Sequence, residues 1–129
     1  MIVVDTNIIA YLLIRGGGSE ASERLQQSDP DWVAPRLWMD EFLNVLCTYE
    51  RNGLLSARDA TNLIGDAQLL MDGKSYDVPP HRVLSVARRT GCSGYDSQYI
   101  TLAEELGVNL YTNDRKILAA CPELAVMPP

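Results

Sequence analysis

The sequence predicts a three-layer α/β/α sandwich of the Rossmann-like kind, built on a mostly parallel sheet. Short apolar segments rich in β-branched residues alternate with longer segments in which apolar residues recur every three or four positions. Strands and helices that alternate in this way form βαβ units, which place parallel strands in one sheet and helices on both of its faces. Glycine or a polar capping residue stands at many of the expected helix boundaries, where such residues are typical.

The chain opens with a strand followed by a helix. Residues 1–4 are apolar and end at Asp5, and residues 7–15 have the apolar spacing of a helix. Three glycines at 16–18 interrupt it, and residues 19–27 form a second predicted helix with Ser19 as its N-cap. No Gly-Lys-Ser/Thr sequence follows the glycines, so they predict a flexible loop rather than a phosphate-binding loop.

A second strand and two long helices come next. Residues 32–34 read as a short strand, and Pro35 is expected to begin a helix over residues 35–52, since proline is favoured in a first helical turn. Ser56 is the expected N-cap of a helix over residues 57–71, because a serine hydroxyl can accept from an amide of the first turn.

The third strand is the weakest of the expected elements, at residues 75–78, and it leads into a helix that begins at the proline pair and ends at residue 90. Gly91 terminates that helix. Ser93 can cap the next one, residues 94–106, and Gly107 ends it.

The last βαβ unit follows directly. Residues 108–111 form the fourth predicted strand, residues 112–114 a turn, and residues 115–120 a short helix. Residues 124–127 complete the sheet as its fifth strand. The expected domain organisation is a single domain over residues 1–129.

Composition is that of an ordinary globular domain, with 47% hydrophobic and 22% charged residues. No apolar stretch is long enough to span a membrane, and we expect neither a signal peptide nor a membrane anchor. Cysteines number three and lack the spacing of a disulfide framework or a zinc site, which favours the reducing cytoplasm. The single histidine, His81, is expected at the surface.

Two acidic residues, Asp5 and Asp114, directly follow predicted strands. In open α/β sheets, ligands bind beyond the carboxyl ends of the strands, so acids at these positions are candidates for a functional site. Each has an alternative interpretation as the N-cap of the helix that follows, and for the second helix Asn113 could also serve as the cap.

Two further acids are expected on inward faces of helices. Glu41 lies within an apolar stripe that includes Phe42 and Val45, whereas its neighbour Asp40 falls on the wetter side. A buried carboxylate requires a partner, either a metal or an arginine, unless it reaches past the stripe to solvent. Asp96 shares a face with Tyr99, and it could also form a capping pair with Ser93. Other faces of that helix carry Ser97, Gln98 and Thr101.

Together the four acids predict a site for hard divalent cations. Two unit charges about 5 Å apart repel by roughly 3 kcal/mol at an effective dielectric of 20, so a cluster of carboxylates requires cations. Mg²⁺ and Mn²⁺ prefer carboxylate and water oxygens, whereas Zn²⁺ prefers histidine and cysteine. The hypothesis is therefore a single Mg²⁺ or Mn²⁺ site formed by Asp5, Glu41, Asp96 and Asp114.

Four segments carry a resemblance to PIN domains, and it spans nearly the whole chain: Val-Val-Asp5-Thr6-Asn7, Glu41-Phe-Leu-Asn44-Val-Leu, Tyr95-Asp96 and Leu110-Tyr-Thr112-Asn113-Asp114-Arg115. The chain most resembles stand-alone toxins of the VapC type, from toxin–antitoxin pairs. The resemblance implies a PIN-like fold, endonucleolytic cleavage of RNA with bound Mg²⁺ or Mn²⁺, homodimerisation and inhibition by a small antitoxin. It also implies supporting hydrogen bonds from Asn7 and Thr112.

The net charge of −6 opposes RNA binding, although setting aside the four candidate ligands leaves −2. Arg15, Arg115 and Lys116 are the expected phosphate contacts, with exposed helix surface as the alternative. Two other functions remain open. A phosphoacceptor receiver module also has an aspartate after a strand, but it requires an adjacent acidic pair and a late lysine. A PIN fold could also act as a non-catalytic binding subunit of a complex.

Overall fold

The computed structural model describes all 129 residues, and it confirms the predicted α/β architecture. Its strands are β1 (Ile2–Val4), β2 (Trp32–Pro35), β3 (Ser75–Tyr76), β4 (Leu110–Tyr111) and β5 (Ala125–Val126). Its helices are α1 (Thr6–Leu13), α2 (Ser19–Ser28), α3 (Leu37–Arg51), α4 (Ala57–Leu70), α5 (Pro80–Thr90), α6 (Gly94–Leu106) and α7 (Arg115–Ala120).

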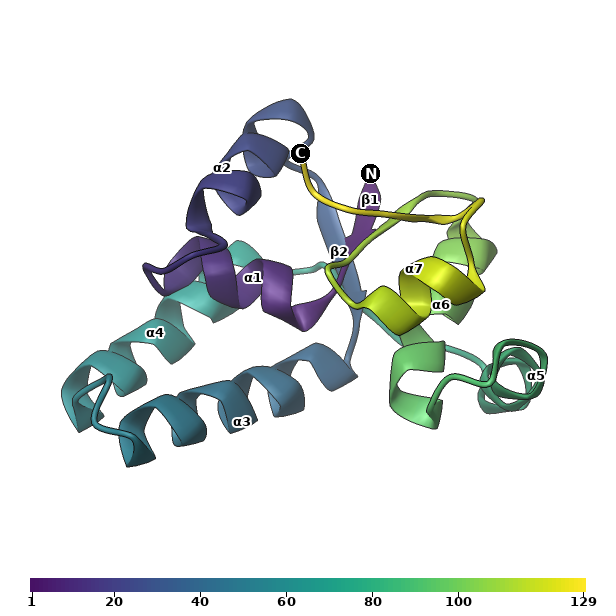
Figure 1. The fold of residues 1–129 in the computed structure, drawn as a ribbon. Coiled ribbons are helices and arrows are strands. Elements are labelled where there is room, and N and C mark those ends of the chain that lie inside the picture. The colour runs from purple at the N-terminus through teal and green to yellow at the C-terminus, as the bar shows by residue number, and fades with distance from the viewer.

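The five strands form one sheet in the order β3-β2-β1-β4-β5, and every neighbouring pair is parallel. In Figure 1, α1 to α4 lie on one side of the sheet and α5 to α7 on the other. The chain therefore leaves β1 toward one face and β4 toward the opposite face. Because β1 and β4 are neighbours, their carboxyl ends form a topological switch point, where such sheets leave a crevice.

The central strands are buried on both faces, which is why they read as continuous apolar runs rather than alternating ones. Val3, Val33 and Leu110 have no exposed surface, and they belong to a cluster of 27 buried residues that forms the core. None of the helices combines the length and the apolar character that crossing a membrane requires.

Two of the predicted helix starts are wrong, for local reasons. Pro35 is the last residue of β2, and α3 begins at Leu37. The missing amide of Pro35 removes no bond to β3, because the amides of Ala34 and Arg36 make those bonds. Ser19 lies inside α2, and Gly18 precedes it as the N-cap. The Ser19 hydroxyl instead donates to the carbonyl of Tyr11 at 2.6 Å, which fastens the glycine loop to α1.

Other predicted boundaries are confirmed. Ser56 accepts a hydrogen bond from the Asp59 amide, and Ser93 accepts one from the Asp96 amide. Gly91 and Gly107 end α5 and α6 in the left-handed region, with φ of 73° and 66°. A residue with a Cβ is disfavoured in that conformation, so glycine at these two positions follows from the backbone geometry.

Helix α6 is more deeply buried than its sequence predicts. It packs on β1, β2 and β4 on one side and on α5 on the other, so Ser97 and Thr101 have no exposed surface. The Thr101 hydroxyl donates back to the Ser97 carbonyl at 2.6 Å, which satisfies it without a tertiary partner. This part of the predicted polar side of the helix is therefore interior, whereas Gln98 is half-buried.

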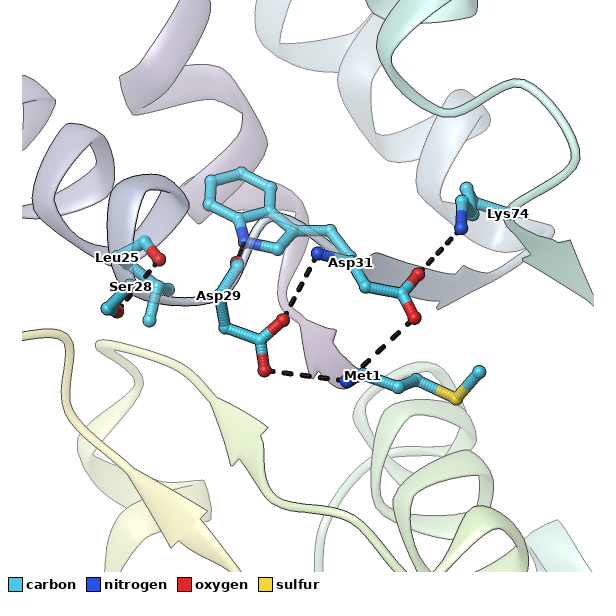
Figure 2. A network of polar contacts seen from close by, with 7 residues as sticks. Met1, Leu25, Ser28, Asp29, Asp31 and Lys74 are labelled. Atoms are coloured by element: carbon cyan, nitrogen blue, oxygen red, sulfur yellow. Dashed lines mark hydrogen bonds and ion pairs between the residues drawn. The ribbon is translucent and has the colours of Figure 1, made fainter.

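A network of charged groups connects the amino ends of β1, β2 and β3 (Figure 2). Asp31, just before β2, accepts a hydrogen bond from the Lys74 ammonium at 2.6 Å, and its other oxygen lies 3.8 Å from the Met1 amino group. Asp29 lies 3.4 Å from that amino group. Since the strands are parallel, this network stands at the edge of the sheet opposite the switch point.

Candidate active site

The four predicted acids line one cavity of about 570 Å³ at the carboxyl edge of the sheet. Asp5 follows β1, Asp114 follows the turn after β4, Glu41 comes from α3, and Asp96 comes from the first turn of α6. The residues lining this acidic cavity are Asp5, Thr6, Asn7, Leu37, Asp40, Glu41, Asn44, Val45, Tyr95, Asp96 and Asp114. Segments far apart in sequence thus meet at the switch point between β1 and β4.

Asp5 occupies the N-cap position of α1, but its side chain makes no capping hydrogen bond. Thr112, after β4, donates to Asp5 Oδ2 at 2.8 Å, so the carboxylate is held across the switch point. Burial raises the pKa of Asp5 to about 6, and repulsion from Glu41 and Asp96 adds to the rise, whereas the Thr112 hydroxyl opposes it. The capping interpretation of Asp5 is therefore wrong.

Glu41 has two hydroxyl partners and no arginine. The Tyr99 hydroxyl donates to Glu41 Oε1 at 2.6 Å, and Thr6 Oγ1 lies 3.1 Å from the same oxygen. The Thr6 and Tyr99 hydroxyls also contact each other, so Thr6 can give its one proton to either group. Burial and the negative charge of Glu41 raise the pKa of Tyr99, which keeps the phenol protonated as a donor.

Asp96 and Asp114 both take part in capping as well as in the cavity. The Asp96 amide donates to Ser93, and Asp114 Oδ1 accepts from the amides of Lys116 at 2.9 Å and Ile117 at 3.2 Å. Burial raises the pKa of Asp96, and repulsion from Asp114 and Glu41 raises it further, whereas Lys116 lowers it. The capping interpretation of these two acids is correct, and it does not remove them from the cavity.

Sequence reasoning missed several groups at this site. Asp40, assigned to the wetter side of α3, lines the acidic cavity as a fifth acid. The contacts of Thr6 and Tyr99 with Glu41 were not predicted either, although Thr6 is adjacent to Asp5 in sequence. Tyr95 also lines the cavity, with 65% of its surface exposed. Tyr99 falls at i+3 from Asp96 on the same helix, which is the signal that could have found it.

The predicted supporting residues differ in their contacts. Thr112 bridges two of the acids, because its hydroxyl donates to Asp5 and accepts from the Asp114 amide at 3.0 Å. Asn7 lines the cavity but makes no side-chain hydrogen bond within the protein. Arg115 and Lys116 are exposed at the start of α7, beside Asp114. Arg15 lies elsewhere, in a separate cavity between α1, α3 and α4.

The lining of the acidic cavity suits a hard cation by its chemistry. Its ligating groups are carboxylates, amide oxygens and hydroxyls, and it contains neither His81 nor a cysteine. Burial is the main cause of the raised pKa values of Asp5 and Asp96, and repulsion from neighbouring acids adds to it, so a cation would favour the ionised form of both. In this arrangement, however, no three acidic, histidine or cysteine side chains are placed to hold one ion together. Asp5, Glu41 and Asp114 are instead hydrogen-bonded to the protein.

A sequence model of the PIN domain matches residues 2–121. The chain belongs to the PIN-domain family. It is 29% identical over 126 residues to the protein named Ribonuclease VapC3 from Pyrobaculum aerophilum, an alignment that covers 95% of this chain and 96% of that protein. This relationship extends over nearly the full length of both proteins.

Two solved structures share the fold of this PIN domain. The crystal structure of PAE2754 from Pyrobaculum aerophilum superposes with a TM-score of 0.73 and 25% identity, covering 92% of this chain and 84% of that one. The crystal structure of FitAcB from Neisseria gonorrhoeae superposes with a TM-score of 0.74 and 18% identity, covering 99% and 98%. The second similarity supports the fold alone.

Proposed function

We propose that this PIN domain is a metal-dependent endoribonuclease that hydrolyses RNA phosphodiesters. The observation that carries the proposal is the convergence of Asp5, Glu41, Asp96 and Asp114 on one cavity at the switch point of the sheet. The similarity to a protein named a ribonuclease supports the choice of RNA as substrate.

The four carboxylates would hold Mg²⁺ or Mn²⁺, either directly or through water. A bound ion of this kind lowers the pKa of a water molecule and stabilises the leaving oxygen. Because Glu41 and Asp114 already accept hydrogen bonds through one oxygen each, their other oxygens are the ones available to an ion or its water shell. Burial raises the pKa of Asp5 and of Asp96, so a bound cation would favour the ionised form of these two acids.

Neutral hydroxyls orient the ligands on both sides of the cavity. Thr112 fixes the rotamer of Asp5, and Tyr99 with Thr6 fixes that of Glu41. This arrangement constrains the carboxylates without neutralising them, as the hydrogen-bond partners of metal ligands typically do. Lys116 is exposed at the start of α7, where its amide donates to Asp114, and its ammonium would attract a phosphate to this edge of the cavity.

The proposed reaction leaves a 5′ phosphate and a 3′ hydroxyl. The oxygen of a water molecule adds to phosphorus, the bond to the 3′ oxygen breaks, and that oxygen leaves as a hydroxyl. No histidine lines the cavity, so attack by the ribose 2′ oxygen with a histidine as base is disfavoured. End-group analysis of the products distinguishes these two routes.

The experiment that tests the proposal compares RNA cleavage by the purified chain in Mg²⁺, Mn²⁺ and chelator, beside Asp5→Asn and Asp96→Asn. We expect cleavage that requires the ion and falls at least about a hundredfold in either variant. Asp66→Asn is the matched control, since Asp66 is exposed on α4 and lines a different cavity. Cleavage that persists in chelator, or in both site variants, would refute the proposal.

We also propose that the chain is the toxin of a toxin–antitoxin pair, acting in the cytoplasm as a homodimer that a small antitoxin protein inhibits. Its similarity to a protein with a VapC name supports this. Expression should arrest growth, and co-expression of the protein encoded by the adjacent gene should restore it. If Asp96→Asn arrests growth equally, the effect does not arise from this site.

A further inference from the structure

A second cavity adjoins the acidic one and shares two of its walls. It has a volume of about 590 Å³ and lies between β3, the β3–α5 connection, α5 and α6. Gly94 and Gln98 of α6 line it, while Tyr95 and Asp96, between them in sequence, line the acidic cavity. On the other side Arg36 lines the second cavity and the next residue, Leu37, lines the first. We call this second cavity the α5–α6 cleft.

The walls of the α5–α6 cleft are largely apolar. Tyr76, Val78, Val83 and Leu84 line it, and 54% of Leu84 is exposed. Apolar side chains that line a cleft open to solvent, with a few polar groups among them, are typical of a ligand-binding groove. The acidic cavity offers no comparable apolar surface, since only Leu37, Val45 and Tyr95 contribute to it.

One wall of the cleft belongs to a helix rich in arginine, although Arg36 is the only cation in the lining itself. Helix α5 has three arginines and no acidic residue, in a chain whose net charge is −6. Arg82 and Arg89 pair with glutamates of α6, whereas Arg88 has no ion pair. Arg36 pairs with Asp77 at 2.6 Å, and both lie at the mouth of the cleft, with 66% and 82% of their side chains exposed. An ion pair this exposed is weak, so a phosphate can replace Asp77.

One polar group in the wall is free to select a ligand. The Gln98 amide lines the cleft and makes no hydrogen bond within the protein. A primary amide carries both a donor and an acceptor, which is the arrangement that recognises the edge of a nucleobase. Gln98 lies two residues from Asp96 on the same helix, so a ligand on it would be held close to the acidic cavity.

We propose that the α5–α6 cleft is a nucleobase subsite for the RNA substrate. It accepts an unpaired base beside the scissile phosphate, with Val83 and Leu84 against its face, Gln98 on its edge and Arg36 on the adjoining phosphate. This inference rests on the proposed function, and it makes the substrate class single-stranded RNA. A base that is paired in an RNA duplex cannot enter the cleft between α5 and α6.

A metal-free binding experiment tests it independently of cleavage. Backbone amide NMR spectra of the chain are recorded in chelator with each of the four nucleoside monophosphates, and with ribose 5-phosphate as the base-free control. We expect shifts for amides of α5 and around Gln98 with at least one nucleotide, and none there with the sugar phosphate. Absence of shifts with all four nucleotides at millimolar concentration would overturn the proposal, as would equal shifts with the base-free control.

Three variants connect the cleft to cleavage. Val83→Trp fills it, Ser85→Trp places the same side chain on an exposed position of α5 outside it, and Gln98→Leu removes the polar group at similar volume. Val83→Trp should abolish nucleotide shifts and reduce cleavage about tenfold with unchanged Mn²⁺ binding. Ser85→Trp should do neither, and Gln98→Leu should change the preference among bases in a series of oligonucleotides.

The remaining outcomes separate this proposal from the proposed function. If no RNA is cleaved by the unaltered chain although nucleotides bind the cleft, the nuclease proposal fails and the base site stands. If RNA is cleaved but Val83→Trp and Gln98→Leu leave its rate and base preference unaltered, the base site fails alone. If Leu84→Glu converts a dimer to a monomer in sedimentation and nucleotides do not bind, a second copy of the chain occupies the cleft.

Discussion

Asp5 is the acid whose ionisation the metal-free fold opposes most. It is held between β1 and β4, its burial is the largest cause of its raised pKa, and its one hydroxyl partner, Thr112, compensates only in part. A carboxylate in such a position is stabilised by protonation or by a cation. The same property that would suit Asp5 to metal binding therefore makes it a source of instability in the metal-free protein.

The stability of the metal-free chain should fall as pH rises because of Asp5. The folded pKa of about 6 exceeds the ordinary value of 3.8, so the folded state binds the proton more tightly. The stabilisation by protonated Asp5 is fully present below about pH 4 and is lost as pH rises through 6. The free energy of unfolding should fall by up to about 3 kcal/mol over this range. Urea unfolding in chelator, with Asp5→Asn as reference, measures it.

The difference in unfolding free energy between the unaltered chain and Asp5→Asn separates the effect of Asp5 from that of the other carboxylates. At neutral pH, Asp5→Asn should be the more stable by up to about 3 kcal/mol, and the advantage should vanish near pH 4. Asp66→Asn, an exposed substitution on α4, should track the unaltered chain at every pH. A constant difference between the unaltered chain and Asp5→Asn would contradict the assigned pKa.

Tyr99→Phe should loosen Glu41 without changing the core. The substitution removes the phenol that donates to Glu41 at 2.6 Å and keeps a ring that is 1% exposed. Loss of a hydrogen bond to a charged group costs about 1.5 to 3 kcal/mol. We expect unfolding free energy to fall by that amount and Mn²⁺ affinity to fall severalfold, measured by urea unfolding and calorimetry.

Tyr95→Phe provides the control for that substitution, since it deletes the same atom from an exposed tyrosine that makes no hydrogen bond within the protein. Its unfolding free energy should stay within about 0.5 kcal/mol of the unaltered chain. Equal losses in the two variants would mean that Tyr99 does not position Glu41.

At the scale of secondary structure, helix ends and the buried sheet were predictable because local chemistry determines them. Ser56 and Ser93 cap where a hydroxyl must accept an amide proton, and Gly91 and Gly107 stand where φ is positive. Pro35 was misassigned because proline suits both the end of a strand and the first turn of a helix, and only the pairing of β2 with β3 decides between them.

The candidate site was predictable in part for a related reason. Asp5 and Asp114 follow strands, so the topology alone brings them together. Asp40 was missed because helical periodicity assigns one apolar stripe, whereas the cavity at the start of α3 is open to both sides of that stripe. The spacing of Tyr99 from Asp96 can place its side chain near the site, but the partner of its hydroxyl, Glu41, lies 58 positions away and is not indicated by that spacing.

Two glycines should respond to alanine in opposite directions. Gly107 ends α6 with φ of 66°, a conformation in which a Cβ is strained, so Gly107→Ala should lower stability by about 1 kcal/mol. Gly65 lies inside α4, and an added Cβ there meets no atom within 4 Å. Gly65→Ala should raise stability by about 0.8 to 1 kcal/mol, because alanine is the better helix former.

Chemical unfolding of Gly65→Ala and Gly107→Ala checks the direction of each change in unfolding free energy. Destabilisation by Gly65→Ala would show that α4 is not helical at that position, and stabilisation by Gly107→Ala would show that α6 ends elsewhere.

At the scale of the whole molecule, a bound divalent ion should link the two halves of the fold. Asp5 and Glu41 come from the part of the chain that covers one face of the sheet, and Asp96 and Asp114 from the part that covers the other. An ion bound by all four exists only when both halves are docked, so it binds the folded state and not the unfolded chain. Binding of that kind stabilises by mass action, by about 2.7 kcal/mol at a hundred times the dissociation constant.

Thermal unfolding should therefore shift upward in Mn²⁺ by about 10 °C at that excess, since 1 kcal/mol corresponds to roughly 3 to 5 °C for a domain of this size. The shift should shrink below pH 6, where protons compete for Asp5, and it should disappear in Asp5→Asn and Asp96→Asn. Glu50→Gln is the matched control, because Glu50 is exposed on the same helix as Glu41 and lies outside the acidic cavity. A shift of equal size in Asp5→Asn would place the ion somewhere other than between the two halves, and the raised pKa of Asp5 would then have no connection with metal binding.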